Sequence, residues 1–286
     1  MNASSGRLPN FLALGAPRCA TTWLHATLAK HPDIFIAPMK EPEFFGNPPR
    51  FALGTDWYRS LFAGCGKQKR VGEVSVNSFH SPEAPVRIRE TIQDPDLKLI
   101  VLLREPIDRA LSHYQIRLQK GEAPPTFEQA LDDPKMPLRG EGHYIEDYRR
   151  YRTLFSKEQI GIFLYEDIER DARKVLKDIC VFLNVDPSFF DSYQNMRVNK
   201  SEAVRSVPVS MIIGYLGRAI RFVLPYGGVG ERIRERLQRW NMRWNRKPGT
   251  MPLRAETRKA LEKEYAQDND FLAREAEISL SAWKYR

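Results

Sequence analysis

Arginine and hydroxyl side chains recur together at two places in this sequence. Arg18 precedes Thr21 and Thr22 in the stretch GAPRCATT, and Arg104 precedes Ser112 in the stretch REPIDRALS. Guanidinium and hydroxyl groups donate hydrogen bonds to phosphate oxygens, and a charged partner makes such bonds stronger. The two stretches therefore predict two phosphate sites, although a structural ion pair at Arg104 and a packing role for Ser112 are the alternative.

The stretch GAPRCATT, which we call the phosphate loop (residues 15–22), lies between an apolar run and a helical pattern. Backbone N–H groups at a helix N-terminus bind anions, Gly15 permits a tight turn, and Ala20 is small. A nucleotide P-loop needs a lysine for the β- and γ-phosphates, but Thr21 stands at that position. The loop predicts a donor without a γ-phosphate and without a metal, or otherwise an ordinary turn.

A carboxylate group follows in the stretch KEPEFF, residues 40–45. Glu41 and Glu43 stand beside Lys40 and two phenylalanines, so a half-buried pocket could hold a general base here. A solvated charged loop above core phenylalanines is the alternative.

Alternating strand and helix patterns must position these side chains. Strands are predicted at 11–15, 34–37, 98–103 and 161–165, with helices at 22–30, 107–120, 127–131 and, after an acidic turn at 166–167, at 172–183. This alternation predicts an α/β fold in three layers, with a P-loop-like central parallel sheet flanked by helices. Ligands of such sheets bind beyond the carboxyl ends of the strands, where Arg104 stands.

The bulk composition is that of a globular chain of 286 residues, which we expect to form a single domain over 1–286. No apolar run reaches the roughly 18 residues of a spanning helix, and residues 1–10 lack the apolar core of a signal peptide. Three cysteines, Cys19, Cys65 and Cys180, are too few for a disulfide framework. These features predict a cytoplasmic protein.

Most of the net charge of +9 lies in one C-terminal region. Residues 197–259 hold 15 Lys and Arg against 4 Asp and Glu. This concentration predicts a local anionic partner and no nucleic acid.

Within this region, residues 205–250 predict a helical hairpin appended to the core. Its apolar stripes are Ile212, Leu216, Ile220 and Val223, then Val229, Ile233, Leu237, Trp240 and Trp244. Three interpretations stay open: the stripes pack on the core, the hairpin lines an acceptor cleft, or residues 209–246 lie peripherally on the inner face of a membrane.

Four ordered phrases resemble the PAPS-dependent sulfotransferases, in particular the branch with bacterial and heparan-sulfate enzymes. They are GAPRCATTWLHATLAKHPDI, KEPEFF, LIVLLREPIDRALSHY and IGIFLYEDI, and the closing LSAWKYR is also typical. The likeness covers about residues 10–200 well and 250–286 loosely. The chain lacks the pair of cysteines that the animal enzymes have near the C-terminal end. This difference is consistent with the reducing cytosol of a bacterium.

The resemblance implies PAPS (3′-phosphoadenosine 5′-phosphosulfate) as donor, PAP as product and no metal. It implies that the nucleotide is held by Gly15, Ala16, Pro17, Arg18, Cys19, Ala20, Thr21, Thr22, Trp23, Arg104, Ser112 and Lys200. Arg18 would balance charge on the bridging oxygen, and Arg104 with Ser112 would hold the 3′-phosphate. Glu41 would be the general base for the hydroxyl or amine of an acceptor, either a small molecule, a carbohydrate or a glycolipid.

Four positions depart from the family pattern. Ala20 replaces the usual glycine, Glu43 stands for a histidine of heparan 3-O-type enzymes, Gly46 for their aspartate and Val74 for a substrate-contacting lysine. The acceptor site is therefore not expected to copy the heparan one. Two other functions remain as alternatives: a P-loop-like small-molecule kinase, and a non-catalytic PAP-binding protein recruited to a membrane.

Overall fold

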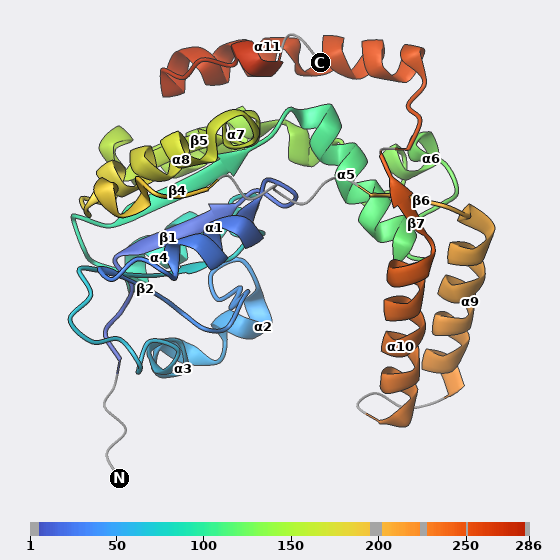
Figure 1. Ribbon diagram of the computed structural model, residues 1–286, viewed down its shortest axis with the longest axis horizontal. Coiled ribbons are helices and arrows are strands. Elements are labelled where there is room, and N and C mark those ends of the chain that lie inside the picture. The colour runs from blue at the N-terminus through green and yellow to red at the C-terminus, as the bar shows by residue number, and fades with distance from the viewer. Residues whose placement is uncertain (1–5, 195–201, 224–227, 250, 284–286) are drawn as a thin grey trace. The chain divides into compact units, whose positions relative to one another are not determined.

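A computed structural model describes residues 6–194, 202–223, 228–249 and 251–283. The chain divides into two compact units, one of residues 1–105, 144–198 and 268–286, the other of residues 106–143 and 199–267. Figure 1 labels the elements. Within the described ranges, no helix is both long enough and apolar enough to cross a bilayer.

The first unit is built on a sheet of five parallel strands in the order β2-β3-β1-β4-β5. The strands are β1 (Phe11–Gly15), β2 (Ile34–Ile36), β3 (Arg70–Val74), β4 (Lys98–Leu103) and β5 (Ile160–Leu164). From β1 the chain crosses to β2 at one edge of the sheet, returns to β3 beside β1, and then forms β4 and β5 on the other side of β1. The strand order therefore reverses beside β1, which is where open α/β sheets bind ligands.

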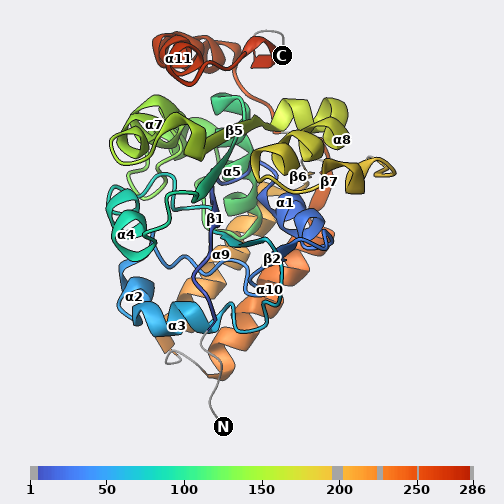
Figure 2. The ribbon, with the colours of Figure 1, turned by 90° about the vertical axis from the view of Figure 1, so that its left-hand side faces the viewer.

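Helices cover both faces of this sheet, as Figure 2 shows: α1 and α8 lie on one side, α4 and α7 on the other. The helices of the unit are α1 (Thr21–Leu28), α2 (Pro48–Phe51), α3 (Gly54–Ser60), α4 (Ala84–Thr91), α7 (Tyr144–Arg152) and α8 (Tyr165–Phe182). Short 3₁₀ turns add η2 (Lys157–Gln159), η3 (Pro187–Phe190) and η4 (Ser281–Trp283). The predicted three-layer α/β fold is thus confirmed.

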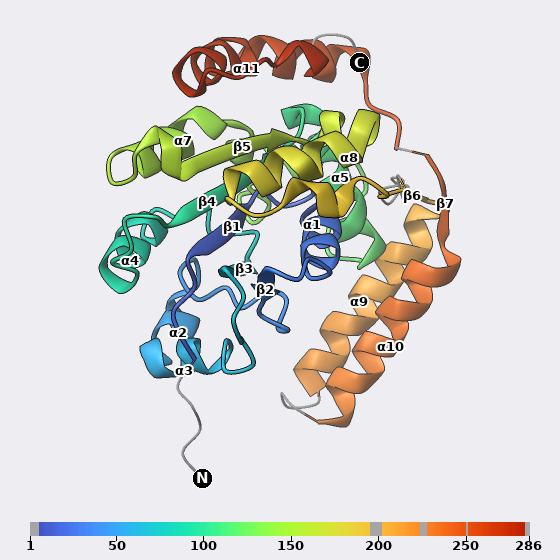
Figure 3. The same cartoon turned by 60° about the vertical axis from the view of Figure 1, so that its left-hand side comes forward.

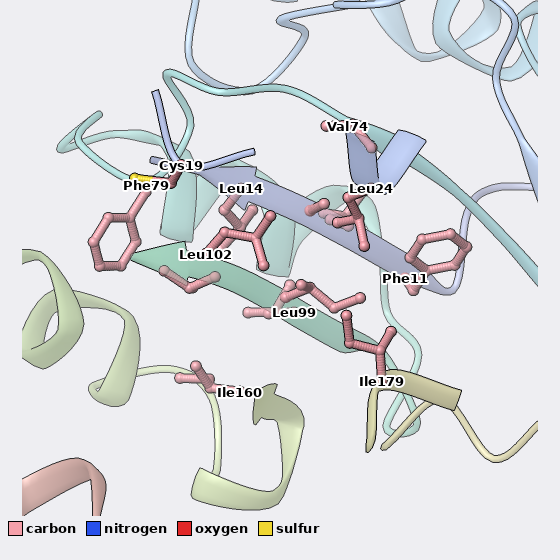
Figure 4. Packing of buried hydrophobic residues seen from close by; sticks show 14 of the residues in the cluster. Phe11, Leu14, Cys19, Leu24, Val74, Phe79, Leu99, Leu102, Ile160 and Ile179 are labelled. Carbon is pink, nitrogen blue, oxygen red and sulfur yellow. The ribbon is translucent and has the colours of Figure 1, made fainter. Parts of the chain in front are cut away.

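The strands β1 and β4 are apolar on both faces because both are buried between the helical layers. Figure 4 shows Phe11 and Leu14 of β1 packed beside Leu99 and Leu102 of β4. This rigid centre carries the phosphate loop at the end of β1 and Arg104 at the end of β4.

One predicted boundary is wrong. The acidic pair Glu166 and Asp167 is not a turn before a helix at 172–183, because α8 already begins at Tyr165. The helix is interrupted at Asp171, whose backbone is extended (φ −152°, ψ 83°). The sequence pattern detected only the second half because the break separates the two halves.

The second unit consists of helices with a small antiparallel ribbon. Its elements are α5 (Pro106–Gln119), α6 (Phe127–Leu131), η1 (Gly140–Gly142), β6 (Glu202–Val204), α9 (Val207–Val223), α10 (Val229–Trp244) and β7 (Arg246–Pro248). Helix α11 (Ala255–Ala276) contains the boundary between the units at residue 267. Figure 3 shows α9 and α10 side by side, which confirms the predicted helical hairpin.

The predicted apolar stripes of the hairpin do not form its packed face. Ile212, Leu216 and Ile233 are exposed, as are Trp240 and Trp244, whereas Ser210, Ile213, Asn241 and Asn245 are buried. Apolar periodicity identified the helices correctly, but small and polar residues make the contacts between them.

Candidate active site

The phosphate loop turns sharply because Gly15 has a backbone conformation that other residues rarely adopt. Its φ is +128°, and a Cβ at this position would lie 2.2 Å from the Val76 carbonyl oxygen. The next residue is tied to the neighbouring strand, since Ala16 N–H donates to the Leu102 carbonyl at 2.7 Å. Arg18 and Ala20 also have positive φ, 71° and 66°. The loop therefore curls over the end of β1.

The loop leads into α1, whose N-terminus is not capped by a side chain. Ala20 has no side-chain oxygen, and the first N–H bonded within the helix is that of Leu24, to the Ala20 carbonyl at 3.0 Å. The preceding N–H groups of a helix have no helical acceptor and point outward along its axis. This end of α1 is suited to an anion.

The side chains of the loop divide into two sets. Ala16, Pro17, Cys19 and Thr21 are buried in the unit, whereas Arg18 and Thr22 are exposed. Of the two predicted hydroxyls, that of Thr22 is the accessible one. A ligand on this loop would meet mainly backbone N–H groups, Arg18 and Thr22.

Two guanidinium groups lie near each other at this edge of the sheet. Arg104 is buried directly after β4, with its guanidinium carbon 4.3 Å from the centre of the Tyr165 ring. Burial of the Arg18 guanidinium, and then the charge of Arg104, lower the pKa of Arg18. Arg18 still keeps accessible surface, so a ligand can reach it. Neighbouring cations repel each other, and an anion bound between them would relieve that repulsion.

Backbone contacts hold Arg104 in place, and sequence reasoning missed the residues that make them. The Tyr144 hydroxyl donates to the Arg104 carbonyl at 2.9 Å. Glu166 is buried and accepts from the Glu105 N–H at 3.1 Å and from the Trp283 indole N–H at 2.9 Å. The phrases YED and SAW contain these two side chains, but no local pattern indicates that they meet.

Trp23 follows the phosphate loop and is only partly buried. Its indole N–H donates to the Tyr193 hydroxyl at 2.8 Å. This bond connects α1 to the segment just before residues 195–201. The predicted nucleotide contact Lys200 is one of residues 195–201, which lie outside the described residues.

Glu41 lies in a group of three carboxyl side chains. Lys40 Nζ is 2.7 Å from Glu41 Oε1. The Glu43 N–H donates to Ser75 Oγ at 2.9 Å, and Ser75 Oγ donates to Glu73 Oε2 at 3.2 Å. The group therefore joins the loop after β2 to the end of β3.

Two of these carboxyl groups have pKa values raised toward neutral pH. Burial, then the charge of Glu41, raises the pKa of Glu43 to about 7. Burial raises the pKa of Glu73, on β3, to about 8. Crowded carboxyl groups with such pKa values are suited to accepting and passing protons near neutral pH. Sequence reasoning missed Glu73, although a charged residue inside a buried strand is a usable signal.

Ser112 belongs to the second unit, where it is buried on α5. Arg109, on the same helix, is fully buried, with Nη1 2.6 Å from Glu141 Oε2 and Nη2 donating to the Leu138 carbonyl at 2.6 Å. This ion pair fixes α5 against the segment 138–141. The pairing of Ser112 with Arg104 stays a prediction, because the two residues are in different units.

Val74 is buried in β3. It was predicted as a departure from the heparan enzymes, which carry a substrate-contacting lysine at this position, and valine offers no charge there. This part of an acceptor site must therefore differ.

A family model described as "Sulfotransferase domain" matches residues 8–210. A solved sulfotransferase from Alicyclobacillus acidocaldarius has the same fold, with a TM-score of 0.70 and 25% identity, over 97% of this chain and 99% of that one.

Curated relatives match over shorter stretches. The membrane-associated sulfotransferase kil1 of Dictyostelium discoideum is 30% identical over 160 residues, 51% of this chain and 33% of its own length. The human bifunctional heparan sulfate N-deacetylase/N-sulfotransferase 3 is 30% identical over 217 residues, 66% and 24% respectively. The mouse heparan sulfate glucosamine 3-O-sulfotransferase 3B1 is 36% identical over 126 residues, 44% and 31%. The matches thus span about a quarter to a third of these relatives.

Proposed function

Because the chain belongs to the sulfotransferase family, we propose that it moves the sulfuryl group of PAPS to a hydroxyl or amine of an acceptor and releases PAP. The observation that carries this proposal is the pair of cations, Arg18 and Arg104, beside the uncapped N-terminus of α1. In this proposal both units form one sulfotransferase domain.

In this proposal the donor lies across the ends of β1 and β4. The backbone from Gly15 to Trp23 and the Thr22 hydroxyl bind the 5′-phosphosulfate, with no metal. Arg104 binds the 3′-phosphate together with Ser112, and Lys200 contributes from the segment that follows Tyr193. Stacking on Tyr165 keeps the Arg104 guanidinium in a fixed plane, which suits a phosphate.

The transfer is an in-line displacement at sulfur. The acceptor oxygen or nitrogen forms a bond to sulfur while the bond from sulfur to the bridging phosphate oxygen breaks, and the negative charge passes to PAP. Arg18 stabilises that charge on the leaving oxygen. Glu41 removes the acceptor proton, and Glu43 and Glu73 lie close enough to share protons with it.

We propose a carbohydrate or glycolipid as the acceptor. Two relatives are named for action on heparan sulfate, and one is named as membrane-associated. The three free cysteines support a reducing, cytoplasmic location, and a glycolipid acceptor would bring the protein to the inner face of the membrane.

A kinase is the second candidate, because the sheet and loop resemble those of P-loop enzymes. The absence of a lysine at Thr21 argues against it. A protein that binds PAP without catalysis is the third candidate, and the Glu41 group argues against it.

Glu41→Gln tests the proposal against both alternatives. We expect PAP affinity, measured by calorimetry, to stay within about twofold, while PAP release with a glycan and glycolipid acceptor panel falls about 10²–10⁴-fold. A general base that is lost lowers kcat, whereas the donor contacts remain. Turnover should survive EDTA.

Two further measurements make this test decisive. Arg104→Ala should weaken PAP binding strongly while leaving the Glu41 group intact. Transfer from ATP that requires Mg²⁺ would establish the kinase instead, and PAP binding without turnover of any acceptor would establish the binding protein. Wild-type turnover in Glu41→Gln would remove Glu41 as the base.

A further inference from the structure

The α9–α10 hairpin exposes large apolar side chains on both helices. On α9, Ile212 and Tyr215 are 60% and 69% exposed, and on α10, Trp240 and Trp244 are 53% and 62% exposed. Ile212 and Tyr215 are three residues apart and Trp240 and Trp244 four apart, so on each helix the pair shares one face. Pairs of large exposed apolar side chains on both helices of a hairpin indicate a site of interaction.

Apart from Ile213, the side chains described as buried in the hairpin are small or polar, and the large exposed side chains take no part in that packing. A Cβ on Gly214 would lie 1.9 Å from the Gly121 carbonyl oxygen, which shows how closely α9 approaches the end of α5. Asn241 and Asn245 of α10 both donate to Ser210 Oγ at 3.0 Å. The indole rings therefore remain available to a partner.

The same hairpin is strongly cationic. Residues 207–248 contain nine Lys and Arg and two Glu. Both glutamates form ion pairs within α10, Glu231 with Arg234 and Glu235 with Arg239. The exposed arginines of the hairpin are Arg218, Arg232, Arg236, Arg239 and Arg243.

A cavity of about 640 Å³ opens at the root of the hairpin, between α9, α10 and the end of α5. Arg234 lines it, and its Nε is buried without a hydrogen bond among the described residues. Two acidic side chains of the lining, Glu122 and Asp133, offset part of the charge, and Glu122 lies 3.4 Å from Arg117 and 4.0 Å from Arg234. The cationic side chains of the lining are Arg117, Lys120, Lys135, Arg218 and Arg234.

We propose that the α9–α10 hairpin docks on an anionic lipid surface, with its exposed tryptophans in the headgroup region and a lipid phosphate in the cavity. Indole rings and arginine side chains are the groups that helices lying in a membrane interface use. A second copy of the chain is the less suitable occupant, because two such cationic faces would repel each other. A bilayer of anionic phospholipid offers an apolar layer for the indole rings and negatively charged headgroups for the arginine side chains.

Vesicle sedimentation of the full chain tests the proposal, without PAPS or acceptor, so its outcome is independent of the sulfotransferase activity. We expect binding to phosphatidylcholine vesicles with about a third phosphatidylglycerol to be at least about tenfold tighter than to phosphatidylcholine alone, and to weaken with salt. Trp240→Ser with Trp244→Ser, or Arg232→Glu with Arg236→Glu, should each reduce binding about tenfold or more.

Matched controls come from the first unit. Val86→Ser with Val181→Ser removes exposed apolar side chains on α4 and α8, and Lys67→Glu with Arg89→Glu reverses exposed charges. These variants should bind like the wild type. Glycerol phosphate is soluble and has the same phosphate group as the lipid. It should compete only weakly with the vesicles because it lacks acyl chains.

Four outcomes would overturn the proposal. The first is equal binding to neutral and anionic vesicles, and the second is full binding by the tryptophan or arginine variants. The third is a dimer in sedimentation velocity that dissociates in Trp240→Ser with Trp244→Ser, which would make a second copy the partner. Saturable glycerol phosphate binding without vesicle binding would limit the cavity to soluble phosphates and also contradict docking.

Discussion

Ala20 of the phosphate loop has a backbone conformation that is unfavourable for a residue with a Cβ. Its φ of 66° and ψ of 22° place it in the left-handed region, which explains why glycine is usual there in the family that the sequence resembles. A residue with a Cβ in that conformation costs about 1–2 kcal/mol. This unfavourable conformation lies at the start of α1, where the loop must turn.

Ala20→Gly should therefore stabilise the protein by about 0.5–1 kcal/mol, since relief of strain exceeds the added freedom of the unfolded chain. Urea unfolding without ligand measures this change. Ala26→Gly is the matched control, because Ala26 is exposed inside α1 and its replacement should destabilise by up to about 1 kcal/mol. A loss of stability in Ala20→Gly would contradict the strain.

Glu73 sets a pH dependence of stability. The folded chain holds this carboxyl with a pKa of about 8, above the ordinary value near 4.3, so in that window the folded state binds a proton that the unfolded state has released. Stability is then lost as pH rises through the window and levels off above about 8.

Glu73→Gln should remove this loss. The variant and the wild type should be about equally stable below about pH 4, where the carboxyl is protonated in both states, and the variant should gain steadily as the pH rises toward 8. Urea unfolding across this range measures the difference, with exposed Glu90→Gln as control. Parallel pH profiles for variant and wild type would show that Glu73 is not buried with a raised pKa.

At the scale of elements, α5 depends on a buried ion pair. Arg109 is fully buried and Glu141 nearly so, and the arginine also binds the Leu138 carbonyl. Removing one member of a buried ion pair takes the opposite charge away from the other member, which typically costs about 3–5 kcal/mol.

Arg109→Met should lower the unfolding free energy by about that amount, and the loss should appear in the helical signal followed by circular dichroism. Arg149→Met is the control, because Arg149 pairs with Glu275 at the surface, where ion pairs contribute little. An equally small loss of unfolding free energy in both variants would show that Arg109 does not stabilise the packing of α5.

Elements were predicted from sequence wherever apolar runs had the length and period of a strand or helix. The strand at 98–103 and the short helix at 127–131 have the predicted bounds, because burial on both sides and flanking polar residues define them. The first half of α8 was predicted as a turn, and several apolar side chains of the predicted stripes of α9 and α10 are exposed. Periodicity identifies an apolar face, but not whether glycine and asparagine allow another face to pack more closely.

For the whole molecule, the sequence predicted an alternating α/β architecture but not the order of the strands. The loop after β1 and Arg104 after β4 could be expected at one edge of the sheet, and the strand order places them on adjacent strands. The carboxyl group around Glu41 could be predicted only in part, because Glu73 and Ser75 reach it through the pairing of β3 with β1 and β2. Contacts between distant segments leave no local pattern.

The bond from Trp283 to Glu166 also has a consequence for biosynthesis. Its two ends are 117 residues apart along the chain. At about 5–20 residues per second, a ribosome needs on the order of ten seconds to make that stretch. Throughout this delay Glu166 lacks its indole donor, so the nascent first unit cannot complete the support of Arg104 until residue 283 has left the exit tunnel.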